Sequence, residues 1–180
     1  MVGKKFELNH ILPIINIDYF KERNLVIIDR QILQMLQEDA DVAISEIAAR
    51  VGLSSTPCWK RIQKLKEEGV IQKRVVLCDP EKLGLNTTVF VKVSTNHHNE
   101  DWIKKFALSV QDIPEIVEAY RMSGDVDYLL RVIVNDIQGY DAVYKKLIQA
   151  CDLHDVSSSF AMEVIKYSTA LPVQDGSSKA

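Results

Sequence analysis

The chain has 180 residues, a hydrophobic fraction of 47% and a formal net charge of −3. This length suits one large domain or two small ones, and the apolar content is enough for two modest cores. No apolar run reaches the ~20 residues that a membrane helix needs, and residues 1–24 lack the cleavage site of a signal peptide. Three widely spaced cysteines, Cys58, Cys78 and Cys151, argue against a disulfide framework. We therefore expect a cytoplasmic protein that is not attached to a membrane.

Positive charge is concentrated in one short stretch of the chain. Residues 50–74 carry seven Lys and Arg side chains against only Glu67 and Glu68, which gives a net charge of +5. Residues 1–49 have a net charge of −3, and residues 75–180 have a net charge of −5. This asymmetry is expected when one small module contacts a polyanion and the rest of the chain has another task.

Two short helices are predicted before the basic stretch. The first covers about Val26–Glu38, and the second covers about Ile44–Val51, each with apolar residues at helical spacing. Asn24 and Asp41 are available as caps for these helices. Gly52 follows the second helix, where a residue in the left-handed conformation is wanted.

A third, cationic helix begins in the stretch GLSSTPCWKR at residues 52–61. Ser54 or Thr56 can cap it, and a proline suits its first turn because no backbone donor is needed there. Cys58, Ile62 and Leu65 are spaced at i, i+4 and i+7, so they are predicted to face inward. The outward face is polar and carries Thr56, Lys60, Gln63, Lys64 and Glu67. With 70–77 as a short strand or wing, residues 25–77 are predicted to form a winged helix-turn-helix.

After a Pro- and Gly-containing linker at 78–85, the apolar period changes from helical to alternating. The predicted order is β-α-β-β-α-β, the ferredoxin-like αβ-sandwich, and the whole chain is therefore of the α+β class. The predicted strands are 87–94, Ile116–Met122, Tyr128–Val134 and about Ser157–Tyr167, and the predicted helices follow the caps Asn99 and Asp136. The polar tail at 174–180 is predicted to be disordered.

Three stretches, AARVGLSSTPCWKRIQKLKEEGVI, LCDPEKLGL and RMSGDVDYLLRV, together resemble the Lrp/AsnC family of transcription regulators, from about residue 25 to residue 173. TPCWKR, DPEKLGL and SSFAMEVIKYSTALP are most similar to the branch of a cysteine-responsive regulator. The family usually has Asp where Val26 stands and Ser or Thr where Ala43 stands, and residues 1–24 form an N-terminal extension without a counterpart.

The resemblance implies DNA binding by the first domain, and a second domain at 86–173 that dimerises and binds a small amino acid. Assembly of dimers into larger rings such as octamers is also implied. Base readout is expected from Ser55, Thr56, Lys60 and Gln63, and phosphate contacts from Lys60, Lys64, Lys73 and Arg74. Trp59, at the edge of this face, either packs on a neighbouring helix or contacts DNA. One such helix reads only a few base pairs, so a dimer on a pseudo-palindromic operator is expected.

The candidate effector site is the turn Gly124–Asp127 with Tyr128, together with Ser157 and Ser159. A zwitterionic amino acid needs an anion for its ammonium, and the carboxylates of Asp125 and Asp127 meet that need. Its carboxylate needs donors, which the Gly124 N–H and the serine hydroxyls supply. Cysteine is the first expectation for the ligand on resemblance alone, followed by leucine, other branched amino acids and methionine.

Two other functions are alternatives to a regulator. An enzyme is disfavoured because the sequence contains no nucleophile–base pair, no phosphate-cradling glycine loop and no metal-ligand spacing, and Cys58 is predicted to point inward. No catalytic residue, metal or cofactor is therefore expected, and His97 and His98 are assigned to a solvated loop. An architectural protein that compacts DNA without effector control remains an alternative.

Overall fold

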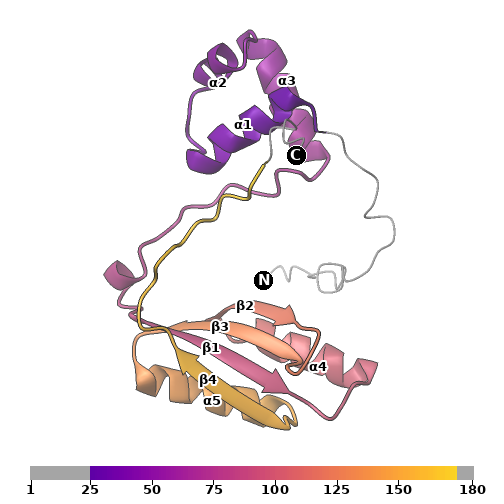
Figure 1. The fold of residues 1–180 in the computed structure, drawn as a ribbon, viewed down its shortest axis with the longest axis vertical. Coiled ribbons are helices and arrows are strands. Elements are labelled where there is room, and N and C mark those ends of the chain that lie inside the picture. The colour runs from indigo at the N-terminus through magenta and orange to yellow at the C-terminus, as the bar shows by residue number, and fades with distance from the viewer. Residues whose placement is uncertain (1–24, 174–180) are drawn as a thin grey trace, which may run out of the picture. The chain divides into compact units, whose positions relative to one another are not determined.

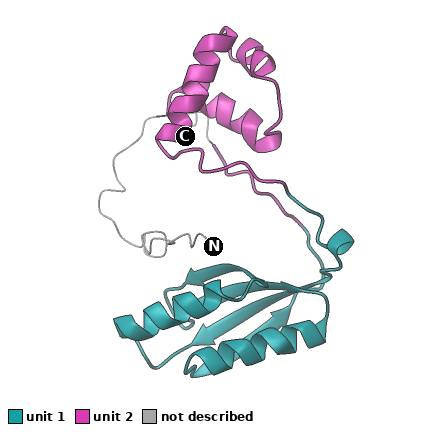
Figure 2. Cartoon of the chain, turned by 180° about the vertical axis from the view of Figure 1, so that it is seen from behind, with its two compact units in different colours: residues 1–11, 77–165 teal, residues 12–76, 166–180 magenta. Residues whose placement is uncertain are grey.

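The structure, a computed structural model, describes residues 25–173. Within them the chain divides into two compact units (Figure 2), one made of residues 25–76 and 166–173 and the other of residues 77–165. The predicted N-terminal extension, the Asn24 cap and the predicted disordered tail lie outside the described residues. The sequence assigned residues up to 173 to the second domain, whereas the contacts of 166–173 place them in the first unit.

The first unit is a bundle of three helices, α1 Ile27–Glu38, α2 Ile44–Arg50 and α3 Ser55–Glu67 (Figure 1). Its buried core collects the inward residues of all three: Ile32 and Leu33, Ile47 and Ala48, and Cys58, Ile62 and Leu65. Gly52 ends α2 with φ +68° and the Leu53 N–H donates to Ala48 O, so the sharp turn into α3 depends on a residue that accepts the left-handed region.

The predicted side-chain caps of the first unit are not formed. The N-cap residues are Val26, Ala43 and Ser54, and none makes a side-chain cap hydrogen bond. Asp41 lies two residues before the N-cap of α2, and Thr56 lies inside α3, so neither occupies the cap position. Tertiary packing of the apolar faces therefore stabilises these helices.

An ion pair ties α1 to α3. Arg61 Nη1 donates to Asp29 Oδ1 at 2.9 Å, and the Asp29 side chain is only 14% exposed. The guanidinium is thus turned toward the helical bundle instead of the polar face of α3.

Asp29→Ala is expected to lower the free energy of unfolding of this unit by about 1–2 kcal/mol, since it leaves Arg61 without its partner. Denaturant unfolding measures the loss. Glu46→Ala is the matched control, because its pair with Arg50 is exposed and contributes at most about 0.5 kcal/mol. An equal loss of unfolding free energy in the two variants would show that the Asp29–Arg61 pair stabilises the fold no more than an exposed pair does.

The second unit is an antiparallel sheet covered on one face by two helices (Figure 1). Its elements in chain order are β1 Thr87–Ser94, α4 Glu100–Gln111, β2 Ile116–Arg121, β3 Tyr128–Val134, α5 Ile137–Ala150 and β4 Asp155–Phe160, and the strand order is β2-β3-β1-β4. The caps predicted for α4 and α5 are confirmed: Asn99 accepts from the Trp102 N–H and Asp136 from the Gly139 N–H. The α+β class and the βαββαβ order are confirmed as well.

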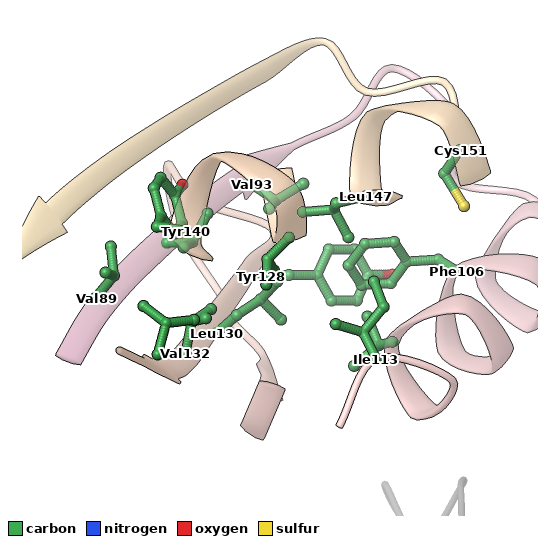
Figure 3. Close-up of a cluster of buried hydrophobic side chains, with 14 of the residues drawn as sticks. Val89, Val93, Phe106, Ile113, Tyr128, Leu130, Val132, Tyr140, Leu147 and Cys151 are labelled. Carbon is green, nitrogen blue, oxygen red and sulfur yellow. The ribbon is translucent and has the colours of Figure 1, made fainter. Parts of the chain in front are cut away.

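The core of this unit lies between the sheet and the two helices (Figure 3). Alternate residues of β1 and β3 are buried on one face, as the period of two requires: Val89, Val91 and Val93, and Tyr128, Leu130, Val132 and Val134. Aromatic rings fill the end of the core near α4, where Trp102 and Phe106 stack at 5.1 Å and Phe106 lies 4.5 Å from Tyr128. The first residue of β3, Tyr128, is therefore fixed by close aromatic packing directly after the turn.

The opposite face of the sheet carries no helix of this unit, and it has an ion pair between β3 and the edge strand β2. The Arg131 guanidinium on β3 donates to Glu118 on β2 and holds the pKa of that carboxyl below its ordinary value of 4.5. Phe90 of β1 is paired with Arg131 in the register and is partly exposed beside it.

The lowered pKa of Glu118 predicts a pH dependence of stability. A carboxyl whose pKa is lowered on folding stabilises the fold above its unfolded pKa, and this contribution is lost as pH falls through the folded value. The free energy of unfolding of the wild type should therefore fall more steeply below about pH 4.5 than that of Glu118→Gln. Urea unfolding at pH 7 and at pH 3.5 checks this, and parallel pH profiles would contradict it.

Of the predicted extended elements, one is absent and one is shorter than expected. No strand forms over 70–77, because these residues have no ladder partner among residues 25–173, and a lone ribbon is not stable by itself. The last strand ends at Phe160 and not near Tyr167. The reason is the length of its partner: Phe160 pairs with Val89, the Ala161 N–H donates to Thr88 O, and β1 begins at Thr87.

Candidate DNA-binding face and effector site

The outward face of α3 presents most of the predicted DNA contacts together. Ser55, Thr56, Trp59, Lys60 and Lys64 are exposed on this helix, and Gln63 is half-buried. The first turn of α3 contains no acidic residue, so its backbone N–H groups and the helix dipole favour an anion at that end. Lys73 and Arg74 lie in the exposed extended chain after α3.

Partners separate the cations of the basic stretch into two groups. Arg50 pairs with Glu46 at 2.8 Å and Arg61 pairs with Asp29, so both are occupied within the fold. Lys64 is 3.8 Å from Glu68, a weak contact, and within residues 25–173 no carboxylate pairs with Lys60. Lys60, Lys64, Lys66, Lys73 and Arg74 are exposed, and none of them is held in a close ion pair within residues 25–173.

Cys58 and Trp59 are neighbours with opposite environments. Cys58 is fully buried, and burial raises the pKa of its thiol although Arg61 opposes the rise, so its environment disfavours the reactive thiolate. Trp59 is 48% exposed and is not part of the helical core. The indole is therefore accessible on the outward side of α3.

The candidate effector turn joins β2 to β3. The Met122 N–H donates to Asp127 O at 2.8 Å and closes the turn, and Gly124 has φ +115°. A Cβ at Gly124 would meet no atom within 4 Å, so glycine is needed there for its backbone conformation and not for space within this chain. Asp125 is exposed at the tip.

Asp127 has a structural role that the sequence did not reveal. Its Oδ2 accepts from the Thr95 N–H at 2.8 Å, and its own N–H donates to Val93 O at 3.2 Å. Thr95 is only 5% exposed, so this carboxylate satisfies a buried donor just beyond β1. Within the part of the chain that the structure describes, Oδ1 of Asp127 accepts no hydrogen bond.

The two halves of the candidate effector site are not brought together within one chain. Ser157 and Ser159 lie on β4, where they pair with Lys92 and Phe90 of β1. The turn precedes β3, which lies on the other side of β1. Two strand spacings separate β3 from β4, about 10 Å. Tyr128 is buried beneath the turn and supports it from the core side.

Comparison with known proteins decides the family. A model described as "Lrp/AsnC ligand binding domain" matches residues 88–171, and one described as "Winged helix-turn-helix DNA-binding" matches residues 25–72. The chain belongs to the Lrp/AsnC family. As in that family, its winged helix-turn-helix binds DNA and its function is transcription regulation.

Individual relatives agree with this assignment. The chain is 45% identical over 148 residues to the DNA-binding transcriptional activator DecR of Escherichia coli K12, covering 82% of this chain and 97% of that protein. A crystal structure of an AsnC family transcriptional regulator from Agrobacterium tumefaciens is 56% identical, with a TM-score of 0.78 over 81% of this chain and 95% of that one. A transcriptional regulator of Neisseria meningitidis in complex with L-Met is 33% identical, with a TM-score of 0.78 over 82% and 96%.

Two features of this Lrp/AsnC chain near the turn escaped sequence reasoning. Arg121 is the last residue of β2 and pairs with Tyr128. Burial raises the pKa of the Tyr128 phenol, and the charge of Arg121 opposes this rise. Lys92 lies between Leu129 and Ser157 on the open sheet face. The alternation along β1 predicts that Lys92 lies on the sheet face opposite to that of the buried valines. Only the strand register shows which residues of the neighbouring strands lie beside it.

Residues 25–173 show no sign of a membrane span or a metal site. No helix there is long and apolar enough to cross a membrane. No three His, Cys, Asp or Glu side chains in this range are grouped so that they could hold a metal ion. His97 Nε2 lies 3.1 Å from Asp152 Oδ2, and both side chains are exposed.

Proposed function

We propose that this regulator binds a pseudo-palindromic operator as a homodimer in the cytoplasm, that a small amino acid controls its affinity for DNA, and that it has no catalytic activity. The observation that carries the proposal is the outward face of α3, where available cations and hydroxyls are displayed beside a helix N-terminus without acidic residues. Relatives of similar length that are transcriptional regulators support it.

The side chains of the DNA-binding face divide by the contacts they are suited to make. Ser55, Thr56, Lys60 and Gln63 occupy the N-terminal half of α3, the part of a recognition helix that reaches base edges. Lys64, Lys73 and Arg74 follow toward its C-terminal end and beyond, and they are assigned to phosphate, with Trp59 packing against the DNA backbone.

The effector is assigned to the β2–β3 turn. Asp125 and Oδ1 of Asp127 offer negative charge to an ammonium, and the Gly124 N–H with Arg121 offers donors to a carboxylate. Because Ser157 and Ser159 lie on another strand of the same chain, they take part only where an assembly brings β4 of a second copy to the turn. An L-Met complex of a relative supports an amino-acid ligand, and the branch resemblance makes cysteine the first to test.

Dimer formation is assigned to the uncovered sheet face. Phe90, Leu129 and Ile133 lie on this face, and the Glu118–Arg131 pair lies among them. A half-apolar sheet face without a helix is normally buried by another layer. Larger rings such as octamers follow from the family resemblance.

The operator part of the proposal is tested by selection of bound duplexes from a random-sequence library. Enrichment of a two-fold symmetric motif is the expected result, since a dimer presents two copies of α3. A bound pool without any enriched motif would favour the architectural alternative.

The effector part is tested by thermal unfolding with a panel of free amino acids. A ligand present at 100 times its Kd stabilises the folded state by about 2.7 kcal/mol, which is readily seen as a rise in Tm. A panel in which no amino acid raises Tm would remove effector control from the proposal.

A further inference from the structure

The end of the described chain is held against α1 by hydrogen bonds between its main chain and two glutamine side chains of the helix. The Leu171 N–H donates to Gln37 Oε1 at 2.7 Å, and Gln37 Nε2 donates back to Leu171 O at 3.1 Å. Gln34 Nε2 donates to Val173 O at 3.0 Å, and the Val173 side chain packs against the core of the helical bundle. We name residues 171–173 the C-terminal clamp.

The clamp holds Leu171 by its backbone alone, and Val173 by both its carbonyl and its side chain. The Leu171 side chain is 73% exposed, so its amide and carbonyl are what α1 holds. Only one orientation of the Gln37 amide provides both an acceptor and a donor to them. Pro172 fixes its own φ and biases Leu171 toward an extended conformation, so little entropy is lost when this segment docks.

The clamp lies on a continuous route from β4 to the DNA-binding helix. Residues 161–170 connect β4 directly to the clamp, and their side chains pack on little: Met162 is 96% exposed. The clamp holds Gln34 and Gln37, one turn apart on α1. The same helix carries Asp29, whose ion pair with Arg61 reaches α3.

We propose that residues 161–173 are a strap which connects the ligand-binding domain to the DNA-binding unit a second time, and that the C-terminal clamp is the point where the strap is closed or released. With the clamp closed, two chain segments, 72–86 and 161–170, tether α1–α3. With the clamp open, only 72–86 does. The functional part of this inference rests on the proposed binding of a dimer to two half-sites.

Closing the strap restricts the separations that two DNA-binding units of a dimer can adopt. A dimer engages its second half-site at an effective concentration set by the tether, and a shorter or doubled tether raises it when the geometry suits the DNA. The gain is pre-organisation and not a new contact with DNA. Releasing the clamp should thus weaken binding to a long duplex and leave binding to a short one unchanged.

The clamp itself is tested on the full chain by amide hydrogen exchange followed by mass spectrometry. Gln37→Ala removes both hydrogen bonds to Leu171, and exchange in the peptides that contain Leu171 and the C-terminal half of α1 should accelerate about tenfold. Two controls keep the clamp: Gln31→Ala alters an exposed glutamine of the same helix, and Leu171→Ala changes only an exposed side chain. Their exchange should match that of the wild type.

Two truncated chains provide a second test, which does not depend on whether a point variant folds. A chain that ends at Ala170 lacks the clamp, and a chain that ends at Val173 retains it. Faster exchange in α1 for the first chain alone is expected. Unchanged exchange in both Gln37→Ala and the chain ending at Ala170 would overturn the clamp.

The function of the strap is tested with random-sequence duplexes of about 12 and about 30 base pairs, which offer room for one and for two recognition helices. For Gln37→Ala and the chain ending at Ala170, affinity for the long duplex should fall about three- to tenfold, with no change for the short one. Equal affinities of variant and wild type for the long duplex would overturn the strap. A wild type that binds neither duplex would instead refute the proposed function, while the exchange experiment still decides the clamp.

Discussion

Lys60→Ala is expected to weaken binding to the selected operator by about tenfold or more and to alter which bases are preferred, because a well-placed side chain at a base edge is worth roughly 1–3 kcal/mol. Lys60 is exposed on the N-terminal half of α3, and no carboxylate within residues 25–173 pairs with it. Fluorescence anisotropy titration of the operator and of a scrambled duplex measures both effects.

Lys73→Ala differs from Lys60→Ala in a way that separates phosphate contact from base readout. It should weaken operator and scrambled duplex alike and reduce the slope of log K against log salt by about one unit. Lys82→Ala is the matched control, because Lys82 is an exposed cation of the linker outside the DNA-binding face. If Lys60→Ala and Lys73→Ala both bind as the wild type does, α3 is not the DNA-binding element.

Substitution of Asp127 is expected to have the largest effect on the effector site, and the choice of replacement decides what is learned. Asp127→Asn keeps an oxygen that can accept from the Thr95 N–H but removes the charge offered to an ammonium. We expect wild-type stability and an affinity for the responding amino acid lower by about 10- to 100-fold, since a charge-assisted hydrogen bond is worth roughly 1.5–3 kcal/mol.

Asp127→Ala removes the structural hydrogen bond as well. It leaves the buried Thr95 N–H without its acceptor, which costs about 1–3 kcal/mol of stability in addition to the lost affinity. Isothermal titration together with urea unfolding of the two variants separates the roles. An Asn variant that binds the amino acid as tightly as the wild type would place the ammonium elsewhere, and the DNA-binding assignment would be unaffected.

The sequence predicted those elements whose local pattern and tertiary packing agree. Alternation in β1 and β3 and the caps Asn99 and Asp136 located four elements of the second unit within one or two residues. The errors in the extended elements lie where a segment's structure depends on a distant partner. The last strand stops at Phe160 because β1 begins at Thr87, and no local property of residues 161–167 reveals this.

The candidate sites show the same division between local and distant information. The face of α3 follows from helical spacing alone, so its exposed residues were predictable. The second role of Asp127 depends on Thr95, 32 residues away in the chain, and the separation of Ser159 from the turn depends on the strand order. Residue spacing in the sequence predicts neither the Asp127–Thr95 hydrogen bond nor the strand order.

Control of DNA affinity by an amino acid is the central claim, and one titration tests it most directly. Anisotropy of a labelled operator duplex is measured at fixed salt, without ligand and with the amino acid that raises Tm most. The account predicts a change in Kd of at least about fivefold for the wild type, the lower range of measured allosteric coupling, and none for Asp127→Asn at the same ligand concentration. Salt-dependent DNA binding with a Kd that no amino acid alters would contradict it and indicate an architectural protein instead.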